Sequence, residues 1–242
     1  MPLSAQAVPM LSDNYAWLLR DEATGAVAFV DPADADACIA AVEAAGGRLD
    51  TVLLTHHHGD HVAGTDAVRA RYGCTVVGAA ADARRLPRLD RTVAEGDTVA
   101  LGGSSLRVID TPGHTIGHIA FFGGENHVLI CGDTLFSLGC GRLLEGTAAD
   151  MYGSLRKLAA LPGDTLVCCG HEYTQSNARF ALHADPDNPA LRVRAAAVDR
   201  LREAGQPTVP SRLSDELAEN PFLRAQDVSA LAKLRAEKDA FR

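Results

Sequence analysis

The sequence has little positive charge and few aromatic residues. Lysine and arginine total 23 against 31 aspartates and glutamates, so the 242-residue chain carries a formal net charge of −8 at pH 7. Nucleic-acid-binding domains usually present a basic surface, and this balance therefore argues against a nucleic-acid partner. No apolar run reaches the roughly 18 residues that suggest a membrane-spanning helix, so we expect no membrane partner either.

Signals for secretion and for thiolate metal sites are also missing. The first six residues lack the basic start and long apolar stretch of a signal peptide. The six cysteines form no C-x-x-C pair, and we expect them to be reduced, mostly buried side chains. We therefore expect a cytoplasmic protein. Nothing in the sequence indicates self-association, and a monomer is the default expectation.

Apolar residues, in contrast, make up 47% of the chain, which is enough to bury a sizeable core. Their pattern predicts strands at 7–10, 15–19, 26–30, 75–77, 106–110, 119–122, 128–131 and 165–168, and helices at 34–45 and 62–72. Thr147 and Asp150 have the spacing of a capping box at the start of a further helix. Strands interleaved with helices indicate an α/β fold in which helices cover sheets.

The pattern changes after residue 170, where helical signals replace strands. Asn188 can cap a helix that has Pro189 in its first turn and runs to about residue 204, where Gly205 ends it. Residues 214–218 and 228–241 are further helix candidates. We interpret the chain from about residue 172 onward as a small α-helical appendage.

The most informative stretch reads Thr-His-His-His-Gly-Asp-His at 55–61, directly after an apolar run. His56 and His58 are two residues apart, so they share one side of an extended segment. Asp60 and His61 can reach a second point nearby after a turn. Imidazole and carboxylate ligands suit borderline cations such as Zn²⁺. The spacing therefore predicts two metal ions close together.

Three more apolar strands end in glycine and a residue of the metal-binding type. These ends are Thr-Pro-Gly-His at 111–114, Cys-Gly-Asp-Thr at 131–134 and Cys-Gly-His-Glu at 169–172. They supply His114, Asp133 and His171. Strand ends are rigid and the following loops let metal and substrate approach, so four such ends in one chain favour a metalloenzyme.

Together, T-H-x-H-x-D-H, G-H-T, G-D-T and G-H-E-Y resemble the motifs of the metallo-β-lactamase superfamily. Within it, the segments at 139–147, 170–174, 220–224 and 235–241 are similar to glyoxalase II, the hydroxyacylglutathione hydrolases. The resemblance covers nearly the whole chain. It implies an αββα sandwich at residues 1–171, with a C-terminal α-helical substrate-binding domain at residues 172–242.

The resemblance also implies a binuclear site and its ligands. One metal ion would be held by His56, His58 and His114, and the other by Asp60, His61 and His171. Asp133 would bridge the two, and Asp60 and Asp133 would serve catalysis beside a metal-bound hydroxide. The family uses zinc, and iron or manganese can occupy similar sites; the seven nitrogen and oxygen ligands suit all three.

Four residues match family positions that contact glutathione, namely Arg142, Tyr173, Arg235 and Lys238. Arg142 stands where some relatives carry lysine, which keeps the charge but changes its geometry. Leu144 stands where some relatives carry tyrosine, which removes a hydrogen-bonding group. We expect His57 and His118 to support the ligands rather than to bind metal themselves.

The implied activity is hydrolysis of S-(2-hydroxyacyl)glutathione, typically S-D-lactoylglutathione, to glutathione and D-lactate, the second step of methylglyoxal detoxification. A thiol has a pKa near 8.5, so thiolate can leave without a strong proton donor. Alternatives on the same scaffold are a persulfide dioxygenase with one iron, a lactonase or another thioesterase. A β-lactamase would be expected to use a thiolate ligand or to lack the helical tail, and a nuclease would need a basic channel. A non-catalytic metal-binding module would typically lack some ligands.

Overall fold

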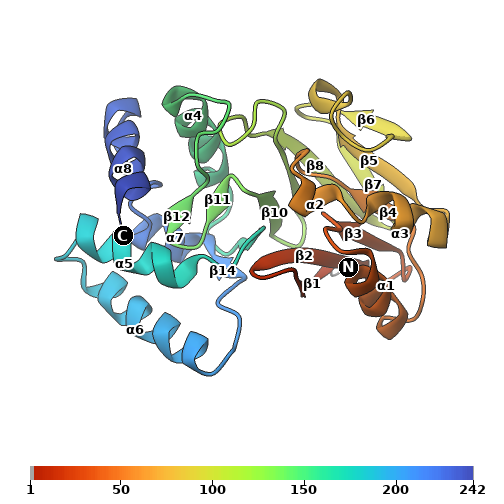
Figure 1. The fold of residues 1–242 in the computed structure, drawn as a ribbon, viewed down its shortest axis with the longest axis horizontal. Helices are drawn as coiled ribbons and strands as arrows, with labels where there is room; N and C mark the ends of the chain where they lie inside the picture. Colours follow the sequence, from red (N-terminus) through yellow and green to blue (C-terminus); the bar gives the residue numbers. More distant parts are fainter. Residues whose placement is uncertain (1–2, 242) are drawn as a thin grey trace.

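The computed structural model describes residues 3–241 and contains two six-stranded sheets (Figure 1). The first sheet has its strands in sequence order: β1 (Leu3–Met10), β2 (Asn14–Asp21), β3 (Val27–Val30), β4 (Thr51–Leu53), β5 (Thr75–Ala79) and β6 (Arg91–Val93). Strands β1 to β3 are antiparallel, whereas β3 to β6 run parallel. The parallel half places several strand ends at one edge of the sheet.

The second sheet has the order β14-β13-β10-β9-β8-β7. Its strands are β7 (Thr98–Leu101), β8 (Ser104–Asp110), β9 (Ile119–Gly123), β10 (Val128–Gly132), β13 (Leu166–Cys169) and β14 (Ser211–Arg212). Strands β10 and β13 are parallel and the other pairs antiparallel. A short hairpin of β11 (Leu135–Phe136) and β12 (Gly139–Cys140) follows β10.

Side-chain alternation along β4 shows how the layers are held. Leu53 packs into the core between the sheets, with Trp17 and Phe121, whereas Val52 and Leu54 face the opposite side. Val52 and Leu54 belong to a second core, which includes Cys38 of helix α1 (Ala35–Ala44) and Val68 of helix α3 (Thr65–Tyr72). Helix α4 (Ala148–Ala159) packs its buried face into the first core. The predicted αββα sandwich is confirmed.

Two local details differ from the sequence prediction. The helix predicted at 62–72 is two helices, α2 (Gly59–Val62) and α3, because the Gly64 N–H donates to the Pro32 carbonyl at 2.8 Å instead of continuing a helix. The short strands β6, β7, β11, β12 and β14 were not predicted. Two predicted helix starts are confirmed. Thr147 and Asp150 form both bonds of the capping box, and Asn188 caps a helix that has Pro189 in its first turn.

The C-terminal helices are α5 (Thr174–Ala184), α6 (Pro189–Glu203), α7 (Leu213–Glu219) and α8 (Val228–Ala240). They gather at one end of the sandwich, the left in Figure 1, away from α1 and α3. Phe180, Phe222 and Leu231 pack into the same core as the sheets. The helices are therefore joined to the sandwich by a shared core. Within residues 3–241, no helix is both long and apolar enough to span a membrane.

Asp21 connects the two sheets and is the basis of a stability prediction. Its buried carboxylate accepts hydrogen bonds from the Ser104 hydroxyl of the other sheet (2.6 Å) and from the Thr24 hydroxyl and N–H (both 2.8 Å). These bonds hold the pKa of Asp21 well below its usual range. A depressed pKa stabilises the fold above the unfolded-state pKa of about 3.9 and loses that effect as pH falls.

We expect Asp21→Asn to lower the urea midpoint at pH 7, because the amide offers one acceptor oxygen where the carboxylate offers two. The gap between variant and wild type should narrow as pH falls below about 4, because the Asp21 carboxylate of the unfolded wild type then takes up a proton while that of the folded protein stays ionised. Urea unfolding at several pH values measures both effects. A gap that stays constant between pH 7 and pH 3 would contradict the role given to ionised Asp21.

Candidate metal centre

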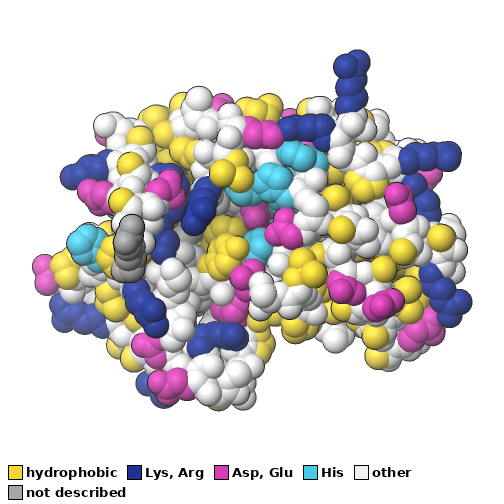
Figure 2. Space-filling view, viewed as in Figure 1, with side chains coloured by type: hydrophobic (Ala, Val, Ile, Leu, Met, Phe, Trp, Pro, Cys, Tyr) yellow, Lys and Arg dark blue, Asp and Glu magenta, His cyan; other side chains and the backbone are white. Residues whose placement is uncertain are grey.

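Histidine side chains gather in the middle of one face, with acidic side chains beside them (Figure 2). They lie on loops that follow strands β4, β8, β10 and β13. The loop after β4 carries His56 and His58, and α2 carries Asp60 and His61. The loops after β8, β10 and β13 carry His114, Asp133 and His171. The structure thus brings all seven residues predicted as ligands to one edge of the sandwich.

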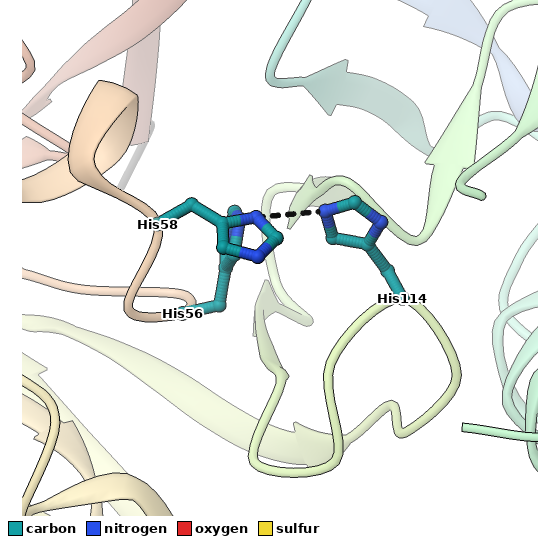
Figure 3. Close-up of side chains that lie close together, drawn as sticks. All are labelled: His56, His58 and His114. Atoms are coloured by element: carbon teal, nitrogen blue, oxygen red, sulfur yellow. Dashed lines mark hydrogen bonds between the residues drawn. The ribbon is translucent and has the colours of Figure 1, made fainter. Parts of the chain in front are cut away.

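A first group consists of His56, His58 and His114 (Figure 3). The Nδ1 atom of His58 lies 3.1 Å from Nε2 of His56 and 3.0 Å from Nε2 of His114. Figure 3 shows the three rings converging from the β4–α2 loop and from the loop after β8. Three ring nitrogens therefore point at one small volume, as the ligands of a single ion do.

A second group consists of Asp60, His61 and His171. Its two imidazole Nε2 atoms are 3.3 Å apart, and Oδ2 of Asp60 lies 3.5 Å from Nε2 of His171 and 3.8 Å from Nε2 of His61. The Asn14 amide donates to Oδ2 of Asp60 at 3.0 Å and thereby orients this carboxylate. This group offers two nitrogen atoms and one oxygen atom as metal ligands.

Asp133 lies between the two groups. Its Oδ2 atom is 3.4 Å from Nε2 of His114 in the first group and 3.3 Å from Nε2 of His171 in the second. Its Oδ1 atom is buried and has no hydrogen-bond partner among residues 3–241. Buried carboxylate oxygens are normally paired, so this oxygen indicates a missing positive partner. A Cβ atom on Gly170 would lie against the same Oδ1, so only glycine fits there.

Hydrogen bonds on the outer side of the rings determine which nitrogen carries the proton. Nδ1–H of His114 donates to the Arg142 carbonyl at 2.9 Å. Nδ1–H of His61 donates to Asp31 at 3.1 Å, and Nδ1–H of His171 donates to Asp13 at 2.9 Å. Because carbonyls and carboxylates only accept, each Nδ1 is protonated, and in the neutral ring the Nε2 lone pair then points inward.

His56 has the same arrangement through an intermediate hydroxyl. Thr55 donates its hydroxyl hydrogen to Asp31 at 2.6 Å, so the Thr55 oxygen is free to accept from Nδ1–H of His56 at 3.0 Å. Nε2 of His56 therefore also directs its lone pair into the site. Inward lone pairs, together with the unpaired Asp133 oxygen, fit a pair of divalent cations.

Electrostatics keep the central carboxylate ionised. Burial by itself would raise the pKa of Asp133, but the positive charge that His61 and His171 carry when protonated outweighs burial and holds that pKa well below its usual range. His118 has the opposite character, since burial lowers its pKa to about 3 and keeps the ring neutral. Its Nε2 accepts the Asp133 N–H at 3.1 Å, and its ring stacks on His56. His118 therefore supports ligands from outside, as the sequence predicts.

His57 also points away from the two groups. Its Nδ1 lies 2.9 Å from the buried carboxylate of Asp82, and its Nε2 lies 3.6 Å from Glu145. Arg85 pairs with both of these acids. This network joins the loop of His56 and His58 to the loop that follows Arg142.

Sequence reasoning missed the acids behind the rings. Asp31 directly follows the apolar strand β3, as His114, Asp133 and His171 follow strands, but it has proline instead of glycine beside it. It could have been found that way. Asp13 lies in the turn between β1 and β2 and carries no comparable signal. Its role depends on His171, which lies 158 positions away in the chain.

A cavity of about 410 Å³ adjoins the site. Its lining includes His114 and Asp133 together with all four residues predicted to contact substrate, namely Arg142, Tyr173, Arg235 and Lys238. The Tyr173 ring stacks on His171, with centroids 4.6 Å apart. Arg235 is buried and donates to Asp239 and to the Cys140 carbonyl, at 2.9 to 3.1 Å. Its charge is therefore largely balanced, which leaves Arg142 and Lys238 as the more available cations.

Comparison with known proteins identifies the family. The metallo-beta-lactamase superfamily model matches residues 13–171, and the hydroxyacylglutathione hydrolase C-terminus matches residues 172–241. A hydroxyacylglutathione hydrolase from Acidiphilium cryptum is 62% identical over 97% of this chain and 95% of its own length. The chain belongs to the hydroxyacylglutathione hydrolase family. A second member, from Rhodospirillum rubrum, is 53% identical over 99% of both chains.

Solved structures agree on the fold. A crystal structure of ETHE1 from Myxococcus xanthus has 25% identity to this family member and a TM-score of 0.71, covering 98% of this chain and 90% of its own. TTHA1623 in a di-iron-bound form has 26% identity and a TM-score of 0.58, covering 69% of this chain and 91% of its own. A di-iron relative on the same fold accords with the two groups of candidate ligands in this chain.

Proposed function

We propose that the protein hydrolyses S-(2-hydroxyacyl)glutathione, typically S-D-lactoylglutathione, to glutathione and a 2-hydroxy acid. The observation that carries this proposal is the pairing of a two-group histidine and aspartate site with a cationic cavity that opens directly onto it. The family supplies the substrate class, since relatives sharing more than half of the sequence bear the name hydroxyacylglutathione hydrolase.

We assign the ligands as the two groups suggest. His56, His58 and His114 would hold one ion, Asp60, His61 and His171 the other, and Asp133 both, with zinc as the expected metal and iron or manganese as substitutes. Two such cations would lower the pKa of a bound water towards about 7 and stabilise charge on the thioester oxygen. The nitrogen-rich donor set, without any thiolate, supports this choice.

The chain's own residues orient this chemistry. Asp31, Asp13 and the Arg142 carbonyl fix three rings by accepting their outer N–H groups, so that the ligands need no rearrangement during turnover. The carboxylates of Asp60 and Asp133 would lie beside the metal-bound water and the thioester carbonyl. In the hydrolysis, the oxygen of water would bond to the thioester carbonyl carbon and the C–S bond would break. The glutathione thiolate would leave without a dedicated proton donor, because the pKa of its thiol is near 8.5.

Charge in the cavity supports recognition of glutathione, which carries two carboxylates. The ammonium of Lys238 lies 3.0 Å from both the carbonyl and the hydroxyl oxygen of Ser176, near the start of α5. Burial, and then the neighbouring Arg235 and Arg142, lower the pKa of Lys238. The cations are therefore close enough to repel one another, and an anionic ligand would relieve that repulsion.

The proposal is tested by assaying purified protein with S-D-lactoylglutathione and measuring its metal content on the same preparation. We expect turnover together with about two metals per chain. Two metals without turnover on this substrate would overturn the glutathione assignment and leave lactones and other thioesters to test. One iron per chain with oxygen uptake on glutathione persulfide would instead establish the dioxygenase alternative.

Replacing Lys238 by methionine is expected to raise KM for S-D-lactoylglutathione about tenfold, with little change in kcat. Methionine keeps an aliphatic side chain and removes the ammonium, and with it the charge that would pair with a substrate carboxylate and the hydrogen bonds to Ser176. Lys233→Met is the matched control, because Lys233 lies on the same helix with its side chain 78% exposed, outside the cavity. Equal KM values in the two variants would show that Lys238 does not contact the substrate.

We also propose that the protein works as a monomer in the cytoplasm. All six cysteines are buried and unpaired, which suits a reducing compartment where glutathione is available. Sedimentation of the purified protein tests the first point and fractionation of cells tests the second.

A further inference from the structure

The hairpin of β11 and β12 lies at the centre of the proposed active site. It begins two residues after Asp133 and ends two residues before Arg142. Phe136 and Cys140, one from each strand, line the cavity. The Phe136 ring packs edge-on against Tyr173 with centroids 5.3 Å apart. The position of this hairpin therefore determines the shape of the cavity beside Asp133.

The hairpin cannot hold its own position. Each of its strands has only two residues, so few hydrogen bonds join them. Its turn contains Leu138, which is fully buried and has a φ of 57°, a left-handed conformation that residues other than glycine rarely adopt. Such a turn persists only where surrounding structure holds it.

The C-terminal helices provide that support, and Glu216 of α7 connects the residues that do so. One oxygen of its buried carboxylate accepts the Leu138 N–H at 2.8 Å and the Asn220 amide at 3.1 Å. The other oxygen accepts from Arg194 of α6. Every neighbour of the carboxylate in this set is a donor, so an ionised acid fits and an amide of the same size does not.

Further bonds join the same turn to three helices. Arg194 also donates to the Ser137 hydroxyl at 2.8 Å, and Asn177 of α5 donates to the Ser137 carbonyl at 3.1 Å. Asn220, which ends α7, donates to the carbonyls of Phe136 and Gly139 at 3.1 and 3.0 Å. The buried polar groups of the turn are thus satisfied by residues that are distant in sequence.

We propose that Glu216 is a positioning residue for the substrate: it holds the turn at Ser137 and Leu138, and thereby sets Phe136 and the adjoining cavity wall. The identity of the substrate rests on the function proposed above, whereas the anchoring of the turn does not. The helical region would then shape the active site from beneath as well as contribute Lys238 and Tyr173 to its lining.

Glu216→Gln tests this proposal against Glu219→Gln as control. Glu219 accepts from the same Arg194 at 2.9 Å but makes no hydrogen bond to the hairpin, so both variants remove one charge from the same arginine. We expect Glu216→Gln to raise KM for S-D-lactoylglutathione about tenfold with kcat changed less than threefold, and Glu219→Gln to stay within twofold in both. Both should retain their metal.

Hydrogen exchange of the peptide 135–140 provides a readout that needs no substrate. We expect faster exchange of the Leu138 amide in Glu216→Gln and unchanged exchange in Glu219→Gln, because only Glu216 accepts that N–H. Equal exchange and equal KM in the two variants would overturn the proposal. A wild type that fails to hydrolyse the thioester would overturn the proposed function instead, and the exchange comparison would still decide the anchoring role.

Ser137→Ala provides a second test of the proposal in case the Glu216→Gln variant does not fold. It removes only the hydroxyl that accepts from Arg194 and leaves the Glu216 contacts in place. We expect a twofold to threefold rise in KM, about the effect of one lost hydrogen bond, and a modest increase in exchange of the turn. No change in either measurement would count against the anchoring of the hairpin by Arg194 and Glu216.

Discussion

Replacing Asp133 by asparagine is expected to lower kcat/KM for S-D-lactoylglutathione about 1,000-fold, which corresponds to about 4 kcal/mol of transition-state stabilisation. The amide keeps the size of the side chain and removes a charge that lies between the two histidine groups, 3.4 Å from His114 and 3.3 Å from His171. Steady-state kinetics and metal analysis on the same sample measure the effect. We also expect metal content to fall below two per chain.

Asp164→Asn is a suitable control for this variant. Asp164 is also an aspartate paired with a histidine, His127, but its side chain is 61% exposed and takes no part in the two groups. Its activity and metal content should match the wild type. If Asp133→Asn kept full activity and two metals, the proposed bridging role would be wrong, and the bound ions would have to be held by the other six residues alone.

Removing the metal with a chelator is expected to abolish turnover and to lower Tm by about 10 °C. Ligands that bind only the folded state at about 1,000 times their Kd stabilise it by about 4 kcal/mol, and each kcal/mol shifts the Tm of a chain of this size by about 2–4 °C. The metal-free site also contains inward nitrogens only 3.0–3.3 Å apart, which are unfavourable neighbours without a cation between them.

Adding about two equivalents of Zn²⁺ should restore both activity and Tm, whereas Mg²⁺ should restore neither. Magnesium prefers oxygen ligands in octahedral geometry, and the first group offers three imidazole nitrogens. Thermal unfolding and activity assays at each step follow the recovery. Full activity in a preparation shown to contain no metal would refute the metal-dependent mechanism.

Much of the fold could be predicted because its signals are local. The capping box at Thr147 and Asp150 and the Asn188–Pro189 helix start depend on contacts within four residues, and both form as expected. Strands β6 and β7 were missed because they are short and partly exposed, so their apolar pattern is weak. The break between α2 and α3 was missed because it depends on the Pro32 carbonyl, 32 positions from Gly64.

The candidate site also divides into features that local sequence signals predict and features that depend on contacts between distant residues. The spacing of His56, His58, Asp60 and His61 and the strand-end positions of His114, Asp133 and His171 were sufficient to predict which residues would gather. Strand β4 belongs to one sheet and β8, β10 and β13 to the other, so the pairing of ligands across the two sheets came from the family resemblance and not from a local pattern. The residues that set proton positions and cavity shape were not readable, with Asp31 as the partial exception.

By itself, the sequence determined the kinds of ligand, their positions at strand ends and the start points of the main helices, because each depends on residues close together in the chain. Only the tertiary structure decided that Asp13 and Asp31 hold the outer N–H groups of His171 and His61, and that Glu216 anchors the turn at Leu138. Those contacts join residues 30 to 158 positions apart, and packing alone brings such residues together.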